Sequence, residues 1–243
     1  MSALIKAKAE KVLEFYGITH PKEINLSLIA AGFDIFIEEK NIDGSLGRIT
    51  HDKKRGIISI DKKISYPPLK RFTIAHELGH FFLQRDSKFI GCSEKNFTEW
   101  NLIGSAENDA NQFAAELLMP ELMFLSYTLG KIISLKLIKD IAKYFETSIT
   151  SAAFRYVDIG RHPSALIYCT DGVVKWSKFN KDFSYKFVPN GSKVLNYSYA
   201  FDFFEGKEIP TNAEEVPLDA WFSACNNYKK TNFFMKNVSH FLP

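Results

Sequence analysis

The sequence predicts an α+β fold: a mainly helical domain with a small antiparallel sheet, followed by a β-rich, aromatic C-terminal region. Hydrophobic residues make up 46% of the 243 residues and charged residues 24%, which is typical of a globular chain with a sizeable core. Helical periodicity dominates the first two thirds, whereas the remainder is rich in Phe, Tyr and Asn and has few helix signals. We therefore expect one domain over residues 1–160 and a small one over 161–243.

Each element is predicted from its own spacing. The segment 33–39 alternates between apolar and polar residues like a strand. Pro120 is expected to end the helix predicted over 105–119. Asp171 and Gly172 are a two-residue turn signal between two apolar runs, which predicts a hairpin. The expected helices are 3–16, 25–31, 69–83, 105–119, 132–145 and 148–157, and the expected strands are 33–39, two within 46–60, 165–169 and 173–179.

Charge and cysteine content narrow the class of protein. The 31 basic and 28 acidic residues leave a formal net charge of +3, which argues neither for a nucleic-acid nor for a membrane partner. Cys92, Cys169 and Cys225 form no CxxC pair and no even disulfide framework, so we expect reduced thiols and a cytoplasmic protein. The N-terminal segment meets Lys6 and Lys8 at once and contains no long apolar core, so we expect no secretory signal. No apolar stretch of the sequence is long enough to span a membrane.

The most informative segment is an HExxH sequence on the helix predicted over 69–83, formed by His76, Glu77 and His80. Residues four apart lie on one face of a helix, so both imidazoles can bind one metal ion. Glu77 points aside from that face, where its carboxylate can accept a proton from the attacking water. The helix is otherwise almost wholly apolar, which disfavours the alternative of two ordinary surface histidines, because a buried glutamate needs a partner.

Two imidazoles leave Zn2+ short of the three protein ligands that a hydrolytic site usually has. The other four histidines lie in unrelated contexts, so the helix predicted over 105–119 is the next source of a ligand. Glu107 stands one turn before Asn111 at the N-terminal end of its apolar face, which makes Glu107 the best third ligand. Asn111 is placed to hydrogen-bond the back of a ligating imidazole. Asp109 and Glu116 point elsewhere and are interpreted as solvated charges.

The runs RFTIAHELGHFFL at 71–83 and ENDANQFAAELLMP at 107–120 resemble the two signature sequences of the ImmA/IrrE family of zinc metallopeptidases. That family has an HExxH helix followed by an ExxANxFAxxLLMP helix whose first Glu binds the metal. The resemblance implies a gluzincin-like fold, zinc held by His76, His80 and Glu107, and Glu77 as the general base. It covers roughly the first 165 residues.

The same resemblance implies a substrate. Members of the family cleave helix-turn-helix repressors, usually encoded beside the peptidase, and so derepress stress-response or mobile-element genes. Some members carry an N-terminal helix-turn-helix domain of their own, whereas this chain begins close to the peptidase core and is similar to the stand-alone form. We therefore expect a zinc-dependent endopeptidase whose partner is a helix-turn-helix repressor, with no direct nucleic-acid partner.

A DNA-binding regulator is an alternative, because residues 134–157 have the spacing of a helix-turn-helix. The second helix of this segment carries a single basic residue, whereas groove binding usually brings several Lys or Arg contacts to phosphate. Two packed helices that complete the peptidase domain are the favoured interpretation. The residues that would face the groove are Thr147, Thr150, Ser151 and Arg155.

A further alternative is a non-catalytic zinc-binding sensor. Glu77 argues against it, and a structural zinc site is usually closed by a fourth Cys or His. Cys92 is the one cysteine near enough in sequence to occupy the fourth position and hold the enzyme latent, although a loop or core thiol is the simpler interpretation.

Two roles stay open in the sequence. The developing oxyanion needs a donor besides the metal. The aromatic segment 179–241 is expected to form the core of the C-terminal subdomain, with a docking surface for the repressor or a ligand-sensing pocket as alternatives. The candidates for the oxyanion donor are Tyr127, Arg155, Tyr156 and His162.

Overall fold

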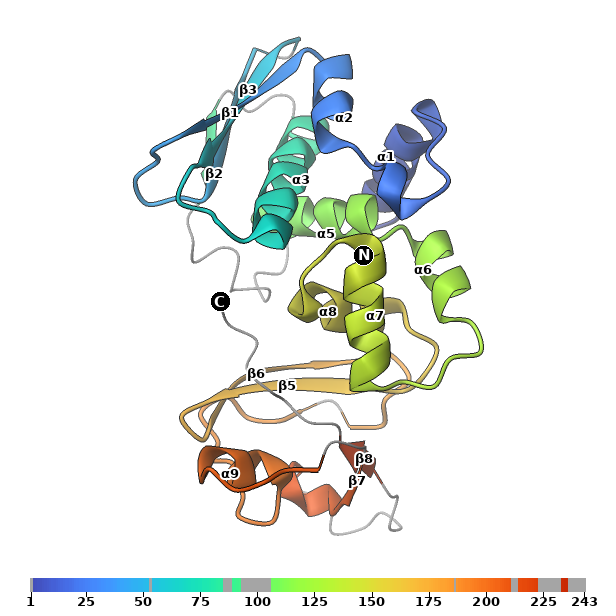
Figure 1. The fold of residues 1–243 in the computed structure, drawn as a ribbon, viewed down its shortest axis with the longest axis vertical. Helices are drawn as coiled ribbons and strands as arrows, with labels where there is room; N and C mark the ends of the chain where they lie inside the picture. The colour runs from blue at the N-terminus through green and yellow to red at the C-terminus, as the bar shows by residue number, and fades with distance from the viewer. Residues whose placement is uncertain are drawn as a thin grey trace. The chain divides into compact units, whose positions relative to one another are not determined.

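The computed structural model describes residues 2–52, 54–84, 106–185, 187–210 and 214–222, together with the backbone of two strands at 89–92 and 233–235. Figure 1 shows the elements along the chain. The helices are α1 (Ala3–Phe15), α2 (Leu26–Gly32), α3 (Pro67–Leu83), α5 (Ala106–Leu118), α6 (Glu121–Thr128), α7 (Leu135–Phe145), α8 (Ile149–Ile159) and α9 (Tyr199–Phe204), with 3-10 turns at Pro21–Glu23 and Leu218–Ala220. The strands are β1 (Ile35–Lys40), β2 (Gly47–His51), β3 (Gly56–Asp61), β4 (Phe89–Cys92), β5 (Ala165–Thr170), β6 (Val173–Phe179), β7 (Glu214–Val216) and β8 (Phe233–Met235).

The chain divides into two compact units, and one of the three boundaries falls within α7. The first unit comprises residues 1–127 and 142–148, and the second comprises residues 128–141 and 149–243. By this criterion α8 groups with the C-terminal strands. The division into two domains at residue 160 stays a prediction.

The four-stranded sheet of the first unit has the order β1-β3-β2-β4 and is mixed. β2 runs antiparallel to β3 and β4, but β1 runs parallel to β3, with Ile35 opposite Gly56 and Lys40 opposite Asp61. The antiparallel pair predicted within 46–60 is confirmed as β2 and β3, and β1 adds to it in the parallel direction, which makes the sheet mixed. The strand order explains the parallel pair. β3 lies between β1 and β2, and β2 runs opposite to β1, so the hairpin return from β2 gives β3 the direction of β1.

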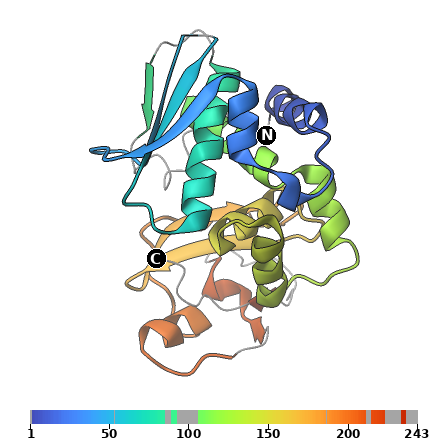
Figure 2. The same cartoon turned by 45° about the horizontal axis from the view of Figure 1, so that its top comes forward.

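Helices cover one face of this sheet. α3 packs against β2 and β3, and α2 packs against β1 and α3 (Figure 2). Ile49, Ile58 and Ile60 are fully buried on the covered face, whereas Phe36 and Ile57 on the other face are 68% and 46% exposed. This alternation is expected of a sheet with one packed side, and the packed side supports the HExxH helix.

α3 begins at Pro67, two residues before the predicted start, and ends at Leu83 as predicted. Proline suits the first turn of a helix, because the N–H group that it lacks has no partner within the helix there. The stretch from Phe72 to Phe81 is buried except for Ile74, so α3 is enclosed on nearly all sides. A helix in this position holds its polar side chains in fixed surroundings.

α6 was not predicted, because its sequence is apolar on almost every side and shows no helical period. It begins directly after Pro120, which does end the preceding helix. The side chain of Glu116 on α5 caps it: Glu116 Oε1 accepts a hydrogen bond of 2.9 Å from the Glu121 backbone N–H. Glu116 is fully buried, so its interpretation as a solvated charge is wrong.

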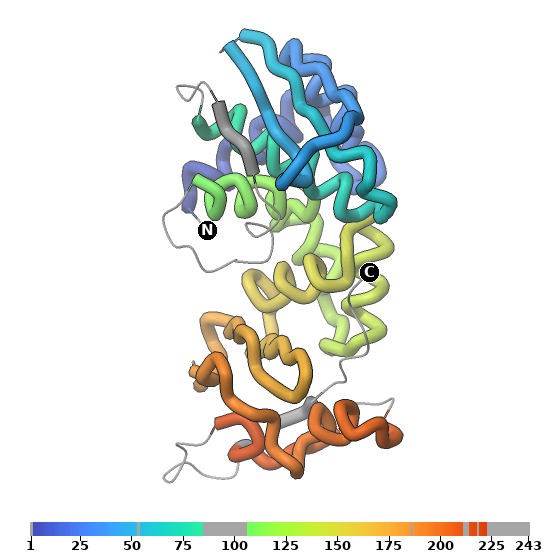
Figure 3. The backbone as a smooth tube through the Cα atoms, turned by 90° about the vertical axis from the view of Figure 1, so that its left-hand side faces the viewer, coloured from blue at the N-terminus to red at the C-terminus, as the bar shows by residue number. Residues whose placement is uncertain are grey.

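The second unit contains the predicted hairpin. β5 and β6 pair antiparallel, and both turn residues have positive φ, 53° at Asp171 and 70° at Gly172, as a type I′ turn requires. α8 contacts both strands, which can be followed in Figure 3. One hydrogen-bonding side chain, Asn180, donates to the backbone oxygens of Val157 and Gly160 and so ties the end of the hairpin to the end of α8.

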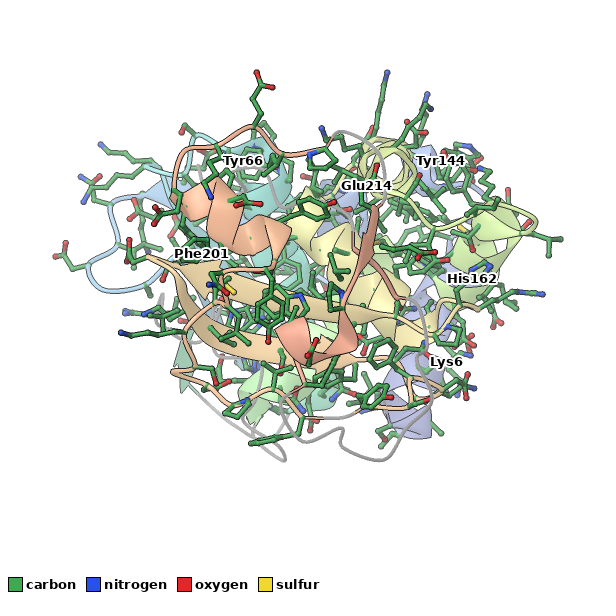
Figure 4. The ribbon with its side chains drawn as sticks, turned by 90° about the horizontal axis from the view of Figure 1, so that it is seen from below. Lys6, Tyr66, Tyr144, His162, Phe201 and Glu214 are labelled. Carbon is green, nitrogen blue, oxygen red and sulfur yellow. The ribbon has the colours of Figure 1, made fainter. Side chains whose placement is uncertain are left out.

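The C-terminal aromatic residues are only partly core. Phe183 and Phe222 are buried with Val174 and Val188 in a small cluster, but Phe187 is 73% exposed. The short helix α9 was not predicted. Figure 4 shows the C-terminal segment from below, with Phe201 of α9 and Glu214 of β7 labelled.

Among the described helices, none has the length and hydrophobicity needed to cross a lipid bilayer.

Candidate metal centre

His76 and His80 lie one turn apart on α3 and are both fully buried. Their Nε2 atoms are 3.0 Å apart, and their rings meet edge to face with centroids 4.7 Å apart. The spacing of four residues produces this convergence, because it places two side chains one above the other on a helix face. The predicted pair of imidazoles is thus brought together by α3 alone.

Glu107 reaches the two imidazoles because α3 and α5 cross closely. At the crossing Gly79 faces Ala110, and a Cβ atom at Gly79 would lie 3.0 Å from both Cα and the carbonyl oxygen of Ala110. A side chain at this position would force the helices apart. The carboxylate oxygens of Glu107, in the first turn of α5, lie 3.3 Å from His76 Nε2 and 3.5 Å from His80 Nε2.

The three side chains suit a small divalent cation. A tetrahedral ion with ligands at about 2.0–2.1 Å separates those ligands by about 3.3–3.4 Å, and the three separations here are 3.0, 3.3 and 3.5 Å. Within the described part of the chain, His76, His80 and Glu107 form the group of His, Cys and acidic residues whose ligand atoms lie close enough to share an ion. Two nitrogens and one carboxylate oxygen are a donor set typical of hydrolytic zinc sites.

Carboxamide side chains contact both imidazoles on the side away from Glu107. Asn111 Oδ1 lies 2.8 Å from His76 Nδ1, and Gln84 Oε1 lies 3.1 Å from His80 Nδ1. A carboxamide oxygen only accepts hydrogen bonds, so in this arrangement each Nδ1 donates and each Nε2 keeps its lone pair. Two such lone pairs 3.0 Å apart, beside a carboxylate, are a site for a cation.

Asn111 lies where the helical spacing predicts it. Gln84 was missed, although its position four residues after His80 was a usable signal.

The pKa values of the three groups follow from burial and from their mutual contacts. Burial lowers the pKa of His76, and the contact with the Glu107 carboxylate offsets only part of this. Burial also lowers the pKa of His80, but its contacts with Glu107, Glu77 and Gln84 outweigh burial and raise the pKa overall. For Glu107 burial acts to raise the pKa, and the close contacts of its carboxylate with both imidazoles outweigh burial and hold the pKa well below the usual range. The lowered pKa values of His76 and Glu107 favour the neutral imidazole and the ionised carboxylate that metal ligands need, whereas the raised pKa of His80 acts in the opposite direction.

Glu77 lies on another side of α3 and outside the ligand group. It is fully buried, and its Oε1 atom lies against β2, where a Cβ atom at Gly47 would be only 2.9 Å away. Asp109 is half-buried on α5 and is likewise absent from the ligand group. Glu77 is therefore not a member of the candidate ligand group, and its role as the general base stays a prediction.

The residues proposed for DNA contact do not share an exposed face. Arg155 is 1% exposed and Thr147 is 7% exposed, so neither side chain presents a surface to a groove. Thr150 and Ser151 are half-buried. The helix-turn-helix interpretation is wrong for Arg155, which lies on the buried side of α8, and for Thr147, which is buried before α8 begins.

The candidates for oxyanion stabilisation have structural contacts of their own. Tyr127 stacks on Tyr144 with ring centroids 4.1 Å apart. Tyr156 is 2% exposed, and its hydroxyl group lies 2.8 Å from His162 Nδ1. The role of oxyanion donor stays unassigned among these residues. The side chain of Cys92, proposed as a latency ligand, lies outside the described residues.

Comparison with known proteins agrees with this geometry. Residues 30–156, more than half of the chain, match the family model described as the IrrE N-terminal-like domain, Peptidase_M78. The metallopeptidase ImmA of Bacillus subtilis (strain 168) is 29% identical over 124 residues, which are 49% of this chain and 65% of that protein. The match therefore spans just under two thirds of the relative's length.

A similar fold occurs in a solved structure, a Mycobacterium tuberculosis transcriptional regulator. The likeness has a TM-score of 0.56 at 18% sequence identity and covers 88% of this chain and 64% of the other. At this identity the likeness concerns the fold. The HExxH helix, the α5 glutamate and the family match over residues 30–156 together show that the chain belongs to the ImmA/IrrE family, whose hallmark is the Peptidase_M78 domain.

Proposed function

We propose that the protein is a zinc-dependent endopeptidase that cleaves a helix-turn-helix transcriptional repressor. The observation that carries the proposal is the convergence of His76, His80 and Glu107 within hydrogen-bonding distance of one another, with Glu77 buried beside them but outside the group. A structural metal site needs no such extra carboxylate. Membership in a metallopeptidase family supports the same reaction class.

His76, His80 and Glu107 would hold the metal. When bound, zinc supplies the Lewis acidity that makes water a nucleophile near neutral pH and polarises the scissile carbonyl. Glu77 accepts a proton from the attacking water on its carboxylate and returns it to the leaving amine. Asn111 and Gln84 hold the imidazoles in the tautomer that leaves Nε2 free to bind.

The resemblance of residues 71–83 and 107–120 to the ImmA/IrrE signatures supports a repressor as the substrate. A cytoplasmic location fits such a partner. The alternative of a DNA-binding regulator is weakened by the burial of Arg155 and Thr147. The alternative of a zinc sensor is weakened by Glu77, since a sensor has no use for a proton acceptor beside its metal.

The test uses the full chain, loaded with one equivalent of zinc, and the helix-turn-helix protein encoded next to its gene. Cleavage at a defined peptide bond is the expected result, with loss of cleavage on chelation and recovery on adding zinc. Casein serves as the control substrate and should stay intact. A protein that binds zinc with high affinity but leaves the repressor uncut would contradict the proposal, and a gel shift of the operator DNA by the peptidase alone would favour the regulator instead.

A further inference from the structure

Gly47, the first residue of β2, lies directly over the carboxylate of Glu77. A Cβ atom at this position would be 2.9 Å from Glu77 Oε1 and 3.3 Å from Glu77 Cγ. It would also be 2.5 Å from Thr73 Cγ2, one helical turn before Glu77. The backbone of Gly47 is not among those with positive φ, so glycine is needed here for space and not for conformation.

Neither backbone can retreat to make room. Gly47 is paired with Ile60 of β3 on one side and with Cys92 of β4 on the other, so it belongs to an interior strand. Thr73 is fully buried, and its hydroxyl group donates a hydrogen bond of 2.9 Å to the Leu69 carbonyl oxygen, which fixes the methyl group toward β2. The group that can move is the carboxylate of Glu77, because it stands at the end of a flexible side chain.

We infer that Gly47 is a positioning residue for the general base: the missing side chain leaves the space in which the Glu77 carboxylate rests. The inference rests on the proposed role of Glu77. Its consequence is that a single methyl group on β2 displaces the proton acceptor. The candidate metal ligands stay in place, because His76 and His80 face α5 and Glu107 lies on α5 itself. Displacement of a catalytic group by about 1 Å can reduce a rate by about 100-fold.

Gly47→Ala tests the inference, with Gly56→Ala as the matched control. Gly56 lies in the neighbouring strand β3, and a Cβ atom there would meet its nearest atoms at 3.4–3.5 Å, which is ordinary contact. Gly47→Ala should bind zinc as the wild type does and lower kcat on the repressor by about 100-fold, with KM little changed. Gly56→Ala should keep the wild-type kcat. A wild-type kcat for Gly47→Ala would overturn the inference.

Thr73→Ser separates displacement of Glu77 from general strain. The serine keeps the hydroxyl group that bonds Leu69 and removes the methyl group that Gly47→Ala would strike. The double variant combines Gly47→Ala with Thr73→Ser. In it the contact between the new Cβ atom and Glu77 Oε1 remains, so kcat should stay low although the melting temperature recovers. Recovery of kcat would show that the methyl contact was responsible and would overturn the inference. The double variant also serves if Gly47→Ala alone folds poorly.

A readout that needs no proteolysis completes the test. Cobalt(II) replaces zinc, and its visible absorption spectrum depends on the groups around the open position of the metal. Gly47→Ala should change the spectrum in the direction that Glu77→Gln does, and Gly56→Ala should leave it unchanged. A wild-type spectrum for Gly47→Ala beside an altered one for Glu77→Gln would overturn the inference. If the wild type cuts no repressor but the two altered spectra agree, the proposed function fails and the positioning role stands.

Discussion

The HExxH segment of α3 presents its polar side chains on two different sides of the helix. One side presents His76 and His80 to α5, where each imidazole has a carboxamide behind it and Glu107 in front. Another side presents Glu77 to β2, where a glycine leaves room for the carboxylate. Because all three side chains are fully buried, burial alone does not distinguish the candidate ligands from the proposed base. The neighbouring element decides the role: a helix that brings ligand atoms, or a strand that leaves space.

The largest effect should come from the side that faces β2. Glu77→Gln should reduce the rate of repressor cleavage by about 100- to 10,000-fold, because an amide cannot accept the proton of the attacking water. The same variant should still bind one zinc ion per chain, measured by metal analysis, because Glu77 lies outside the ligand group. His76→Ala should lose the metal instead. Loss of zinc in Glu77→Gln would mean that the side of α3 that faces β2 also binds the metal, and would contradict the assignment of separate roles to the two sides.

Glu107→Ala should produce the next largest effect, on the side that faces α5. It removes one of three candidate ligands and should weaken zinc affinity by more than about 100-fold. Asp109→Ala, on the same turn of α5 but outside the ligand group, is the matched control and should bind zinc as the wild type does. Competition with a chelator at matched free zinc measures both, since saturating metal would mask a weakened site. Equal affinities for the two variants would remove Glu107 from the site.

The carboxamides should have a smaller effect on the same side. Asn111→Ala and Gln84→Ala each remove a hydrogen bond that orients an imidazole, and each should weaken zinc affinity by about 10- to 100-fold. Asn111→Ala should cost more, because its contact with His76 is shorter and Asn111 is buried, whereas Gln84 is half-buried. The chelator competition used for Glu107 ranks the two variants. A larger loss for Gln84→Ala would reverse this ordering.

Spacing within one helix is easier to predict than contacts between elements distant in sequence. The convergence of His76 and His80, and the place of Asn111 one turn after Glu107, follow from single helices and need no tertiary information. The parallel pairing of β1 depends on where β3 returns, which no local pattern encodes. Gly47 meets Glu77 only through the packing of β2 on α3. In each of these cases the missing information is the identity of a neighbour distant in sequence.

Glu116 shows the same limit within one helix. The helical position of Glu116 places it away from Glu107 on α5. That position does not show that the N-terminus of α6 packs against Glu116. The hydrophobic residues of α6 show no helical periodicity, so the sequence predicts neither this helix nor its cap by Glu116. Glu107 and Glu116 are therefore two acidic residues of one helix whose partners, imidazoles in one case and a helix N-terminus in the other, decide what they do.

The smallest effect on the metal centre should come from Glu116, and it concerns stability. Glu116→Ala leaves the Glu121 backbone N–H without its cap and should lower the free energy of unfolding by about 1–3 kcal/mol. Glu116→Gln keeps an acceptor oxygen in the same place and should lose less. Denaturant unfolding of the zinc-free proteins measures this difference without linkage to the metal. Zinc affinity should match the wild type in both variants, because Glu116 lies outside the ligand group. A large loss of zinc affinity with unchanged stability would instead make Glu116 the metal-binding carboxylate of α5 and leave Glu107 as an ordinary partner of the two imidazoles.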